Sequence, residues 1–259
     1  MPEGDTLYRA ARRLQSLVGQ TATVEGTARA AQEWSGRLSG RRITSIFSRG
    51  KHLVVVFEGD LAVRSHLGMT GVWHLYRTGE QWRKTPGKAR LVVTTADHVA
   101  VCFAAPEVSA GLLGDIEAEM AHLGPDLLAD DFDPSEAAGR APASPADSVA
   151  DLLLDQRVMA GVGNVYKSEV LFLERLHPET PPDSLTSEQL TGLAARARKL
   201  LWANRSRPTR NTTGYGRNAD LWVYGRNRRP CRRCGTNIER RELGELQRST
   251  YWCPRCQPA

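Results

Sequence analysis

Four cysteines constrain the fold of this 259-residue chain more tightly than any other sequence feature. Cys231, Cys234, Cys253 and Cys256 form two C-x2-C pairs that are separated by 18 residues. Two such pairs at this separation are typical of a zinc site, in which four thiolates complete a tetrahedral shell and leave no open position for catalysis. The spacing therefore predicts one structural Zn²⁺ ion. The fifth cysteine, Cys102, lies in an apolar run and is expected to be buried in a strand.

Basic charge is concentrated around these cysteines. The whole chain carries 35 Lys and Arg against 29 Asp and Glu, but residues 196–259 alone carry 16 against 4. Six arginines lie on or between the cysteine pairs: Arg232, Arg233, Arg240, Arg241, Arg248 and Arg255. This uneven distribution predicts contact with a polyanion such as nucleic acid, although a basic surface can also serve solubility alone. A metal-clamped hairpin that carries arginines is well suited to binding phosphate.

The sequence begins Met1-Pro2-Glu3, and a methionine before a small residue such as proline is normally removed. Pro2 would then carry a free secondary amine, and α-amino groups titrate near ~8. Such an amine can attack an electrophilic carbon and form a Schiff base, and the neighbouring Glu3 can transfer protons. The alternative is that these are ordinary residues at the start of a chain.

Hydropathy argues against a membrane or secreted protein. No window approaches the ~18 apolar residues of a membrane span, and the first residues lack the apolar segment of a secretion signal. Hydrophobic residues make up 41% of the chain, as expected for a globular protein. We therefore expect a cytoplasmic, nucleoid-associated protein with no membrane partner.

Residues 1–124 are expected to form an antiparallel β-sandwich domain with a flanking N-terminal helix. Asp5 can N-cap a helix whose apolar residues keep helical spacing up to Gly19. Lys51 lies in a predicted turn, where it can reach a ligand or be solvated. Met69 lies in a glycine-punctuated loop, where the usual position is in the core and the alternative is an exposed wedge for a base stack. Six runs read as strands with tight turns between them: residues 42–47, 52–57, 61–66, 70–76, 89–95 and 98–103.

The remaining residues are expected to form a helical domain and a zinc finger. Prolines mark residues 125–147 as a connector with a short helix at 134–139. Residues 148–220 are expected to contain helices at 148–156, 164–176 and 187–203, followed by a mobile linker at 204–218. A glycine-rich turn makes the first two of these a helix–two-turn–helix, whose backbone N–H groups favour an anion. Asn164 adds a donor there and Gln156 can brace the turn. Residues 221–259 form the zinc-ribbon-like β-hairpin finger.

Five separated motifs occur in order along the chain: MPEG at 1–4, RGK at 49–51, HLGMTG at 66–71, LLDQ at 153–156 with AGVGNVYKSE at 160–169, and RSTYWCPRCQ at 248–257. Together they resemble the formamidopyrimidine-DNA glycosylase/endonuclease VIII family of bifunctional DNA repair enzymes, over essentially the whole chain. The resemblance implies a monomeric enzyme of base excision repair that acts on damaged double-stranded DNA. Such an enzyme removes oxidised bases and cleaves the abasic site by β,δ-elimination.

The resemblance also implies roles for individual residues. Pro2 would form the Schiff base at the sugar C1′, and Glu3 would donate the proton that opens the deoxyribose. Lys51 would assist elimination and hold phosphate. Arg248 would bind phosphate and assist the second elimination. DNA contacts are further implied for His66, Met69, Gln156, Gly163, Asn164 and Tyr166.

Two branches of the family remain open for the substrate. The branch directed to 8-oxoguanine pairs a methionine with an Arg and a Phe from a later loop, and here Met69 is present but residues 104–109, AAPEVS, lack both partners. The endonuclease VIII branch, directed to oxidised pyrimidines, carries Gln-Leu-Tyr where this chain has Leu67-Gly68-Met69. That branch can also carry an Arg where this chain has His122-Leu123. We favour oxidised pyrimidines, and a non-catalytic damaged-DNA-binding protein is the alternative of another class.

Overall fold

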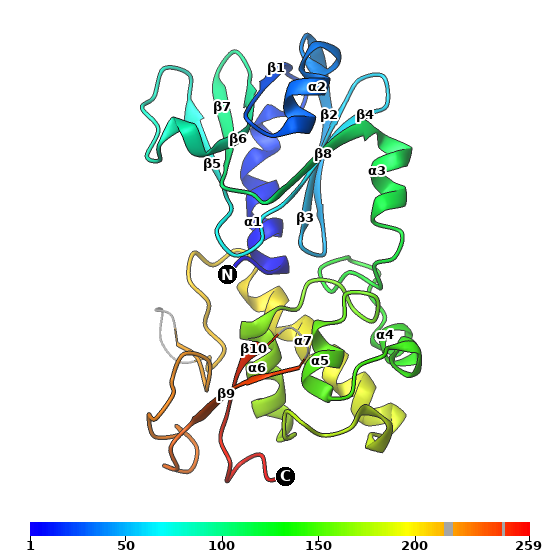
Figure 1. Ribbon diagram of the computed structural model, residues 1–259, viewed down its shortest axis with the longest axis vertical. Coiled ribbons are helices and arrows are strands. Elements are labelled where there is room, and N and C mark those ends of the chain that lie inside the picture. Colours follow the sequence, from blue (N-terminus) through cyan, green and yellow to red (C-terminus); the bar gives the residue numbers. More distant parts are fainter. Residues whose placement is uncertain (215–219, 245–246) are drawn as a thin grey trace. The chain divides into compact units, whose positions relative to one another are not determined.

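The computed structural model describes residues 1–214, 220–244 and 247–259. The chain divides into two compact units, Met1–His122 and Leu123–Ala259 (Figure 1). The end of the predicted linker, residues 215–218, lies outside the described residues. Within the described ranges, no helix combines the length and the apolar character that crossing a membrane requires.

The first unit is built on an antiparallel eight-stranded sheet with the order β5-β7-β6-β1-β2-β3-β4-β8. β1 joins the two halves, because it pairs with β6 on one side and with β2 on the other. Side chains from both halves, such as Val55 and Val93, are buried in one core. The predicted N-terminal antiparallel sheet is confirmed. The strands are β1 (Thr21–Glu25), β2 (Arg41–Arg49), β3 (His52–Phe57), β4 (Leu61–His66), β5 (Val72–Arg77), β6 (Ala89–Thr94), β7 (His98–Phe103) and β8 (Glu107–Leu112).

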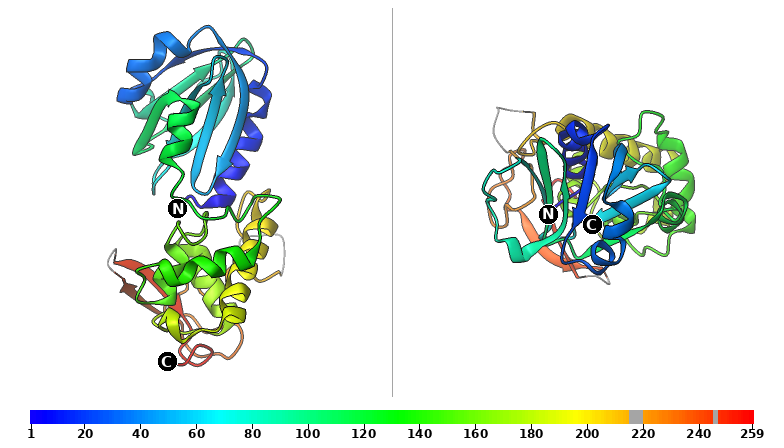
Figure 2. Two further views of the ribbon diagram at one scale, coloured as in Figure 1. Left: turned by 90° about the vertical axis from the view of Figure 1, so that its right-hand side faces the viewer. Right: turned by 90° about the horizontal axis from the view of Figure 1, so that it is seen from above.

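Helices complete the core of the first unit. α1 (Gly4–Leu14) runs along the sheet (Figure 2) and contacts β2, β3 and β5. α2 (Arg29–Leu38) packs against β1 and β8, and α3 (Leu113–Glu119) follows β8. Two short 3-10 helices, η1 (Gln15–Leu17) and η2 (Pro86–Lys88), lie in the connections.

The predicted N-cap of the first helix is wrong. Glu3 is the N-cap of α1, and Asp5 lies buried in the first turn. A carboxylate in the first turn still interacts favourably with the helix dipole. Asp5 therefore does mark the start of a helix, but the N-cap lies two residues earlier than predicted. The helix also ends at Leu14, before the 3-10 turn and Gly19.

The second unit confirms the four predicted helices, with ends that differ by two residues at most. They are α4 (Pro134–Arg140), α5 (Val149–Leu154), α6 (Asn164–Glu174) and α7 (Ser187–Asn204), with 3-10 turns η3 (Ala141–Ala143) and η4 (Pro182–Ser184). α7 begins with a capping box between Thr186 and Gln189, which satisfies two backbone donors reciprocally. α6 is buried over most of its length and contacts α5, α7 and the β-hairpin of β9 (Glu239–Leu243) and β10 (Arg248–Trp252).

Candidate nucleic-acid interface and zinc centre

The N-terminal segment is held in place by α1. Glu3 is fully buried and Pro2 is half-buried. The carbonyl oxygen of Glu3 accepts hydrogen bonds from the backbone N–H groups of Thr6, at 2.8 Å, and Leu7, at 3.3 Å. Because Leu7 is itself fully buried against the sheet, the first residues are fixed to a rigid element. A nitrogen nucleophile at Pro2 and a carboxyl group at Glu3 would therefore be positioned side by side.

Lys51 lies in a tight turn of the same unit. Gly50 and Lys51 connect β2 and β3, whose last paired residues are Arg49 and His52. Gly50 has a φ of +57°, a left-handed conformation that two-residue hairpin turns require and that glycine adopts readily. The Lys51 side chain is half-exposed, and the hairpin fixes the place of its backbone.

The loop between β4 and β5 exposes Met69. Leu67 anchors the loop with 1% of its surface exposed, whereas Met69 is 67% exposed. Gly71 closes the turn with an N–H bond to the carbonyl of Leu67 at 2.8 Å, and the Thr70 hydroxyl donates to the carbonyl of Ala104 at 3.3 Å. Thr70 and Gly71 are thus part of the turn, which is why β5 begins later than predicted. The core interpretation of Met69 is wrong, and the exposed apolar tip remains.

His66 lines a polar pocket that the sequence analysis did not predict. Arg64 Nη2 lies 2.8 Å from Glu119 Oε2, and Arg64 Nη1 lies 3.0 Å from His52 Nδ1. Burial, assisted by the Arg64 charge, lowers the pKa of His52 to about 3, so His52 is neutral near pH 7. Burial also lowers the pKa of His66, against the opposing effect of Glu107 at 3.5 Å from its Nδ1. The cavity has a volume of about 500 Å³ and is lined by His52, Arg64, His66, Glu107, Glu119 and His122.

We expect His52 to make the first unit less stable in acid. Its folded pKa of about 3 lies below the ordinary 6.5, so below pH ~6.5 the unfolded chain binds a proton that the folded chain does not. The contribution of His52 to the free energy of unfolding is complete above pH ~6.5 and is lost progressively as the pH falls to ~3. Between pH ~6.5 and ~5 the loss is about 2 kcal/mol. Thermal melting of the first unit should show this drop in the wild type and a smaller one in His52→Gln.

His98→Gln is the matched control, since His98 also lies in the first-unit sheet but does not line the pocket. It should keep the wild-type drop in melting temperature between pH ~7 and ~5. An identical drop in the wild type and in His52→Gln would show that another group causes the acid sensitivity.

Gln156 braces the turn between α5 and α6, as predicted. Its side-chain Nε2 donates to the carbonyls of Leu154, at 2.7 Å, and Val162, at 3.1 Å. Its Oε1 accepts from the backbone N–H of Gly161 at 3.0 Å. One side chain therefore joins the end of α5 to both sides of the glycine-rich turn.

Three further residues that were predicted to contact DNA, Gly163, Asn164 and Tyr166, lie at the beginning of α6. Gly163 is the N-cap, and a helix N-terminus favours an anion because of its N–H groups and its dipole. The side chain of Asn164 is 6% exposed, and its Oδ1 has no hydrogen-bond partner among the described residues. The Tyr166 ring is fully buried, with the Arg210 guanidinium carbon 5.2 Å from the ring centre.

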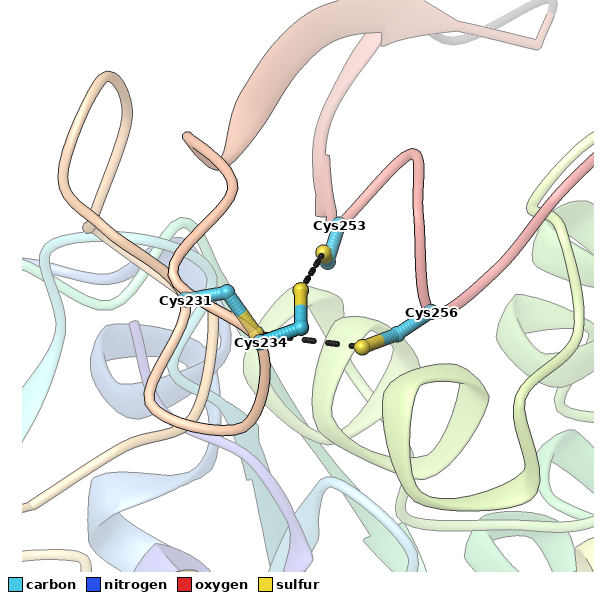
Figure 3. Close-up of side chains that lie close together, drawn as sticks. All are labelled: Cys231, Cys234, Cys253 and Cys256. Carbon is cyan, nitrogen blue, oxygen red and sulfur yellow. Dashed lines mark hydrogen bonds between the residues drawn. The ribbon is translucent and has the colours of Figure 1, made fainter.

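The four predicted zinc ligands converge around the base of the β-hairpin (Figure 3). Their ligand atoms all lie within 4.8 Å of one another. The Sγ atoms of Cys231 and Cys256 are 3.9 Å apart, and those of Cys234 and Cys253 are 3.4 Å apart. Tetrahedral Zn–S bonds of about 2.3 Å place sulfur atoms roughly 3.8 Å apart. The geometry and the donor chemistry both fit one structural zinc ion.

Cys253→Ser is expected to release this zinc and to unfold the finger, because metal binding contributes directly to the folding of such sites. The four ligands belong to the second unit, where Cys231 and Cys253 share a small core with Phe172, Val223 and Ile238. The first-unit melting transition should therefore survive. Metal analysis and thermal melting measure the two effects.

Cys102→Ser is the control. Because Cys102 is buried in the first unit, this variant should keep one zinc ion per protein chain. Active wild-type protein without zinc would contradict the prediction.

The helix α6 contains a group of buried polar residues that was not predicted from the sequence. Lys167, Ser168 and Glu169 are each at most 1% exposed. The signal was present, because these three consecutive polar residues interrupt an apolar segment instead of lying on one solvated face. Arg64 gave a similar signal within the apolar strand β4. Arg248, which was predicted, lies half-buried at the start of β10 opposite Leu243.

Comparison with protein families matches three consecutive parts of the chain. Residues 1–108 match the formamidopyrimidine-DNA glycosylase N-terminal domain, and residues 123–207 match the formamidopyrimidine-DNA glycosylase H2TH domain. Residues 229–259 match the zinc finger found in FPG and IleRS. This last match agrees with the convergence of the four cysteines on one structural zinc ion.

Two curated relatives match over at least 94% of their own length. The chain is 42% identical to "Probable endonuclease 8 2" of Streptomyces coelicolor, over 99% of this chain and 94% of that protein. It is 43% identical to "DNA-(apurinic or apyrimidinic site) lyase Nei2" of Mycolicibacterium smegmatis, over the full length of both. Among solved structures, the Lactococcus lactis Fpg bound to DNA that contains an oxidised pyrimidine has a TM-score of 0.85 and 25% identity, with full coverage of both chains.

Proposed function

Because the chain belongs to the formamidopyrimidine-DNA glycosylase/endonuclease VIII family, we propose that it is a DNA glycosylase with abasic-site lyase activity in base excision repair. The observation that carries the proposal is the N-terminal pair, in which Pro2 stands beside the fully buried Glu3 at the head of a packed helix. Removal of Met1 would leave Pro2 with a terminal amine next to this buried carboxyl group, an arrangement for which a protein that only binds DNA has no use.

Pro2 and Glu3 would divide the chemistry between them. The Pro2 nitrogen forms a bond to C1′ while the bond from C1′ to the base breaks, and the proton that the Pro2 nitrogen loses is taken up by the departing base. Glu3 then protonates the ring oxygen O4′, so that the sugar opens and an iminium links Pro2 to C1′. The iminium acidifies C2′, whose deprotonation expels the 3′ phosphate by β-elimination. A second proton loss, from C4′, expels the 5′ phosphate by δ-elimination.

The cations and the α5–α6 turn would hold the DNA backbone. Lys51 from the first unit, and Gly163, Asn164 and Arg248 from the second, would contact phosphate, which positions a protein on DNA without reading its sequence. His66, whose pKa is lowered by burial, would contact the DNA as a neutral imidazole. The side chain of Gln156 is already used inside the turn, so it would act by holding the turn in shape. The Tyr166 ring is buried beneath Arg210, and would act by supporting that guanidinium.

Oxidised pyrimidines are the proposed substrates. The segment at 104–109 lacks the Arg and Phe that accompany methionine in the 8-oxoguanine-directed branch, and β8 begins inside it at Glu107. The exposed Met69 would enter the base stack where the damaged nucleotide leaves it. The enzyme would work as a monomer in the cytoplasm, on chromosomal DNA. Residues 1–124 would carry catalysis, 125–147 the connection, 148–220 the helical DNA contacts and 221–259 the zinc finger.

Product analysis on four oligonucleotide duplexes tests the proposal. They carry 5-hydroxyuracil, thymine glycol, 8-oxoguanine or an abasic site. We expect cleavage at the abasic site and at both pyrimidine lesions, with phosphate at both ends of the resulting gap. Faster cleavage at 8-oxoguanine than at either pyrimidine would favour the purine-directed alternative. Binding without cleavage of any duplex, including the abasic one, would identify a non-catalytic damage-binding protein.

A further inference from the structure

The middle of α6 carries polar side chains in a position where a helix normally carries apolar ones. Lys167 is 1% exposed, and its neighbours on both sides, Tyr166 and Ser168, are fully buried. A buried ammonium group is costly unless it is paired and hydrogen-bonded. Keeping a lysine here therefore requires contacts that a leucine could not make.

One such contact joins α6 to the zinc hairpin. Lys167 Nζ donates to Thr250 Oγ1 at 2.7 Å, and Thr250 is fully buried in β10. The Thr250 hydroxyl in turn donates to the carbonyl oxygen of Arg248 at 3.1 Å. Because an ammonium group has donors and no acceptor, Thr250 must accept from Lys167, which leaves its own hydrogen for the Arg248 carbonyl. The lysine thus fixes the direction of the whole chain of bonds.

A second contact runs beside the first. The backbone N–H of Tyr251 donates to Ser168 Oγ at 3.3 Å, and the Ser168 hydroxyl donates to the carbonyl oxygen of Asn164 at 3.1 Å. Ser168 therefore links the backbone of Asn164, at the start of α6, to the backbone of Tyr251 in β10. Thr250 links the Lys167 side chain, on the same helix as Asn164, to the backbone of Arg248 at the start of β10. Both connections lie within the second unit.

From these contacts we propose that Lys167, acting through Thr250, is a positioning residue that sets the place of Arg248 relative to Asn164. This inference rests on the proposed function, in which both residues hold phosphate. Two phosphate contacts help each other only if their separation matches that of the DNA backbone, and a displaced guanidinium loses its bond at no change in protein charge. Because Lys167 is 1% exposed, it would itself touch neither phosphate nor the reacting atoms.

Thr250→Val tests this assignment, because it removes the hydroxyl while keeping the side-chain volume and the protein charge. We expect a roughly tenfold weaker Kd for a duplex with a stable abasic analogue at about 0.1 M salt. The slope of log Kd against log salt should fall by about 0.9, equal to one phosphate contact. The single-turnover rate of the first step, β-elimination at an abasic site, should stay within about twofold of wild type at saturating protein. Thr250→Ser, which keeps the hydroxyl, should restore both Kd and the slope.

Lys167→Met provides an independent second variant. Lys167 and Thr250 act through the same hydrogen bond. The double variant Lys167→Met/Thr250→Val should therefore bind DNA no more weakly than whichever single variant has the higher Kd. Lys199→Met removes an exposed charge from α7 and controls for the lost lysine charge. Zinc content measured on each variant shows that the finger is intact. If Thr250→Val loses its zinc, Lys167→Met alone carries the test with the same expected slope change, corrected by Lys199→Met.

The outcomes separate this assignment from the proposed function. Wild-type binding with an unchanged slope in the zinc-replete Thr250→Val, or in the corrected Lys167→Met, would overturn the positioning role and leave the proposed function intact. Additive weakening in the double variant would also overturn it. If the wild type bound no DNA, or if Arg248→Ala left the wild-type slope unchanged, the phosphate role proposed for Arg248 would fail, and the positioning role with it.

Discussion

A permanent extension in front of Pro2 is expected to abolish covalent trapping on abasic DNA. With any residue before it, including Met1, the Pro2 nitrogen is an amide whose lone pair is delocalised into the carbonyl. It can then neither attack C1′ nor form an iminium. Borohydride reduction of wild-type protein on abasic duplex should give a covalent complex, and the extended protein should give none above background.

The same extension placed after Ala259 is the control, and it should trap as well as the wild type. Binding of the extended protein to an abasic-analogue duplex distinguishes lost chemistry from lost access. Pro2→Gly is a poor test, since glycine still offers a terminal amine. Mass spectrometry should find that active wild-type protein begins at Pro2. Equal trapping by extended and wild-type protein would exclude Pro2 as the nucleophile and would direct the search to a lysine.

The parts of the fold that follow from local patterns could be predicted from the sequence. Two cysteine pairs predict their own convergence because one ion must satisfy all four thiolates. The helix α7 carries its capping box in the sequence, at Thr186 and Gln189. The strands β3, β4 and β7 begin and end where their β-branched runs do. In each case the local preference and the tertiary structure agree.

Elements that depend on tertiary contacts were missed. α2 has Ala28 as N-cap, without a side-chain cap bond, so nothing in the sequence marks its start. β8 contains Ser109, Ala110 and Gly111, and is a strand because β4 pairs with it along its length. β1 has only five residues, although its buried and exposed positions alternate. Such short segments have weak intrinsic preferences, which their neighbours override.

The candidate site shows the same division. Pro2, Glu3 and Asn164 could be proposed from residue type, because an amine, a carboxyl group and a helix N-terminus each suggest a chemistry. The exposure of Met69 could not be predicted, since a methionine in such a loop more often lies in the core. The pocket around His52 and Arg64 could not be predicted from the sequence either, because its residues are brought together only when β3, β4 and β8 pair in the sheet.

Arg248→Ala should lose DNA binding, whereas Glu3→Gln should lose base excision. The contrast tests whether Glu3 acts in the chemistry and Arg248 in the binding. Arg248 lies on a hairpin that is stiffened by metal and tied to α6, so its guanidinium can hold a phosphate with little reorganisation. Removing it should weaken binding to damaged and undamaged duplex alike. The log–log salt slope should also fall by about 0.9, as expected for one phosphate.

Glu3→Gln should instead leave binding to an abasic-analogue duplex near the wild-type value. Excision of 5-hydroxyuracil should fall by ~10²–10⁴-fold, because a general acid contributes in the transition state and glutamine has no proton to give. Cleavage of a pre-formed abasic site should fall less, since that sugar is already partly open. Single-turnover rates and Kd values measured on the same duplexes separate these effects.

Since Glu3 is fully buried and Gln has nearly the same shape, a folding defect of Glu3→Gln should be small and would show in the first-unit melting transition. Loss of affinity as large as in Arg248→Ala, or excision at the wild-type rate, would remove Glu3 from its role as the acid.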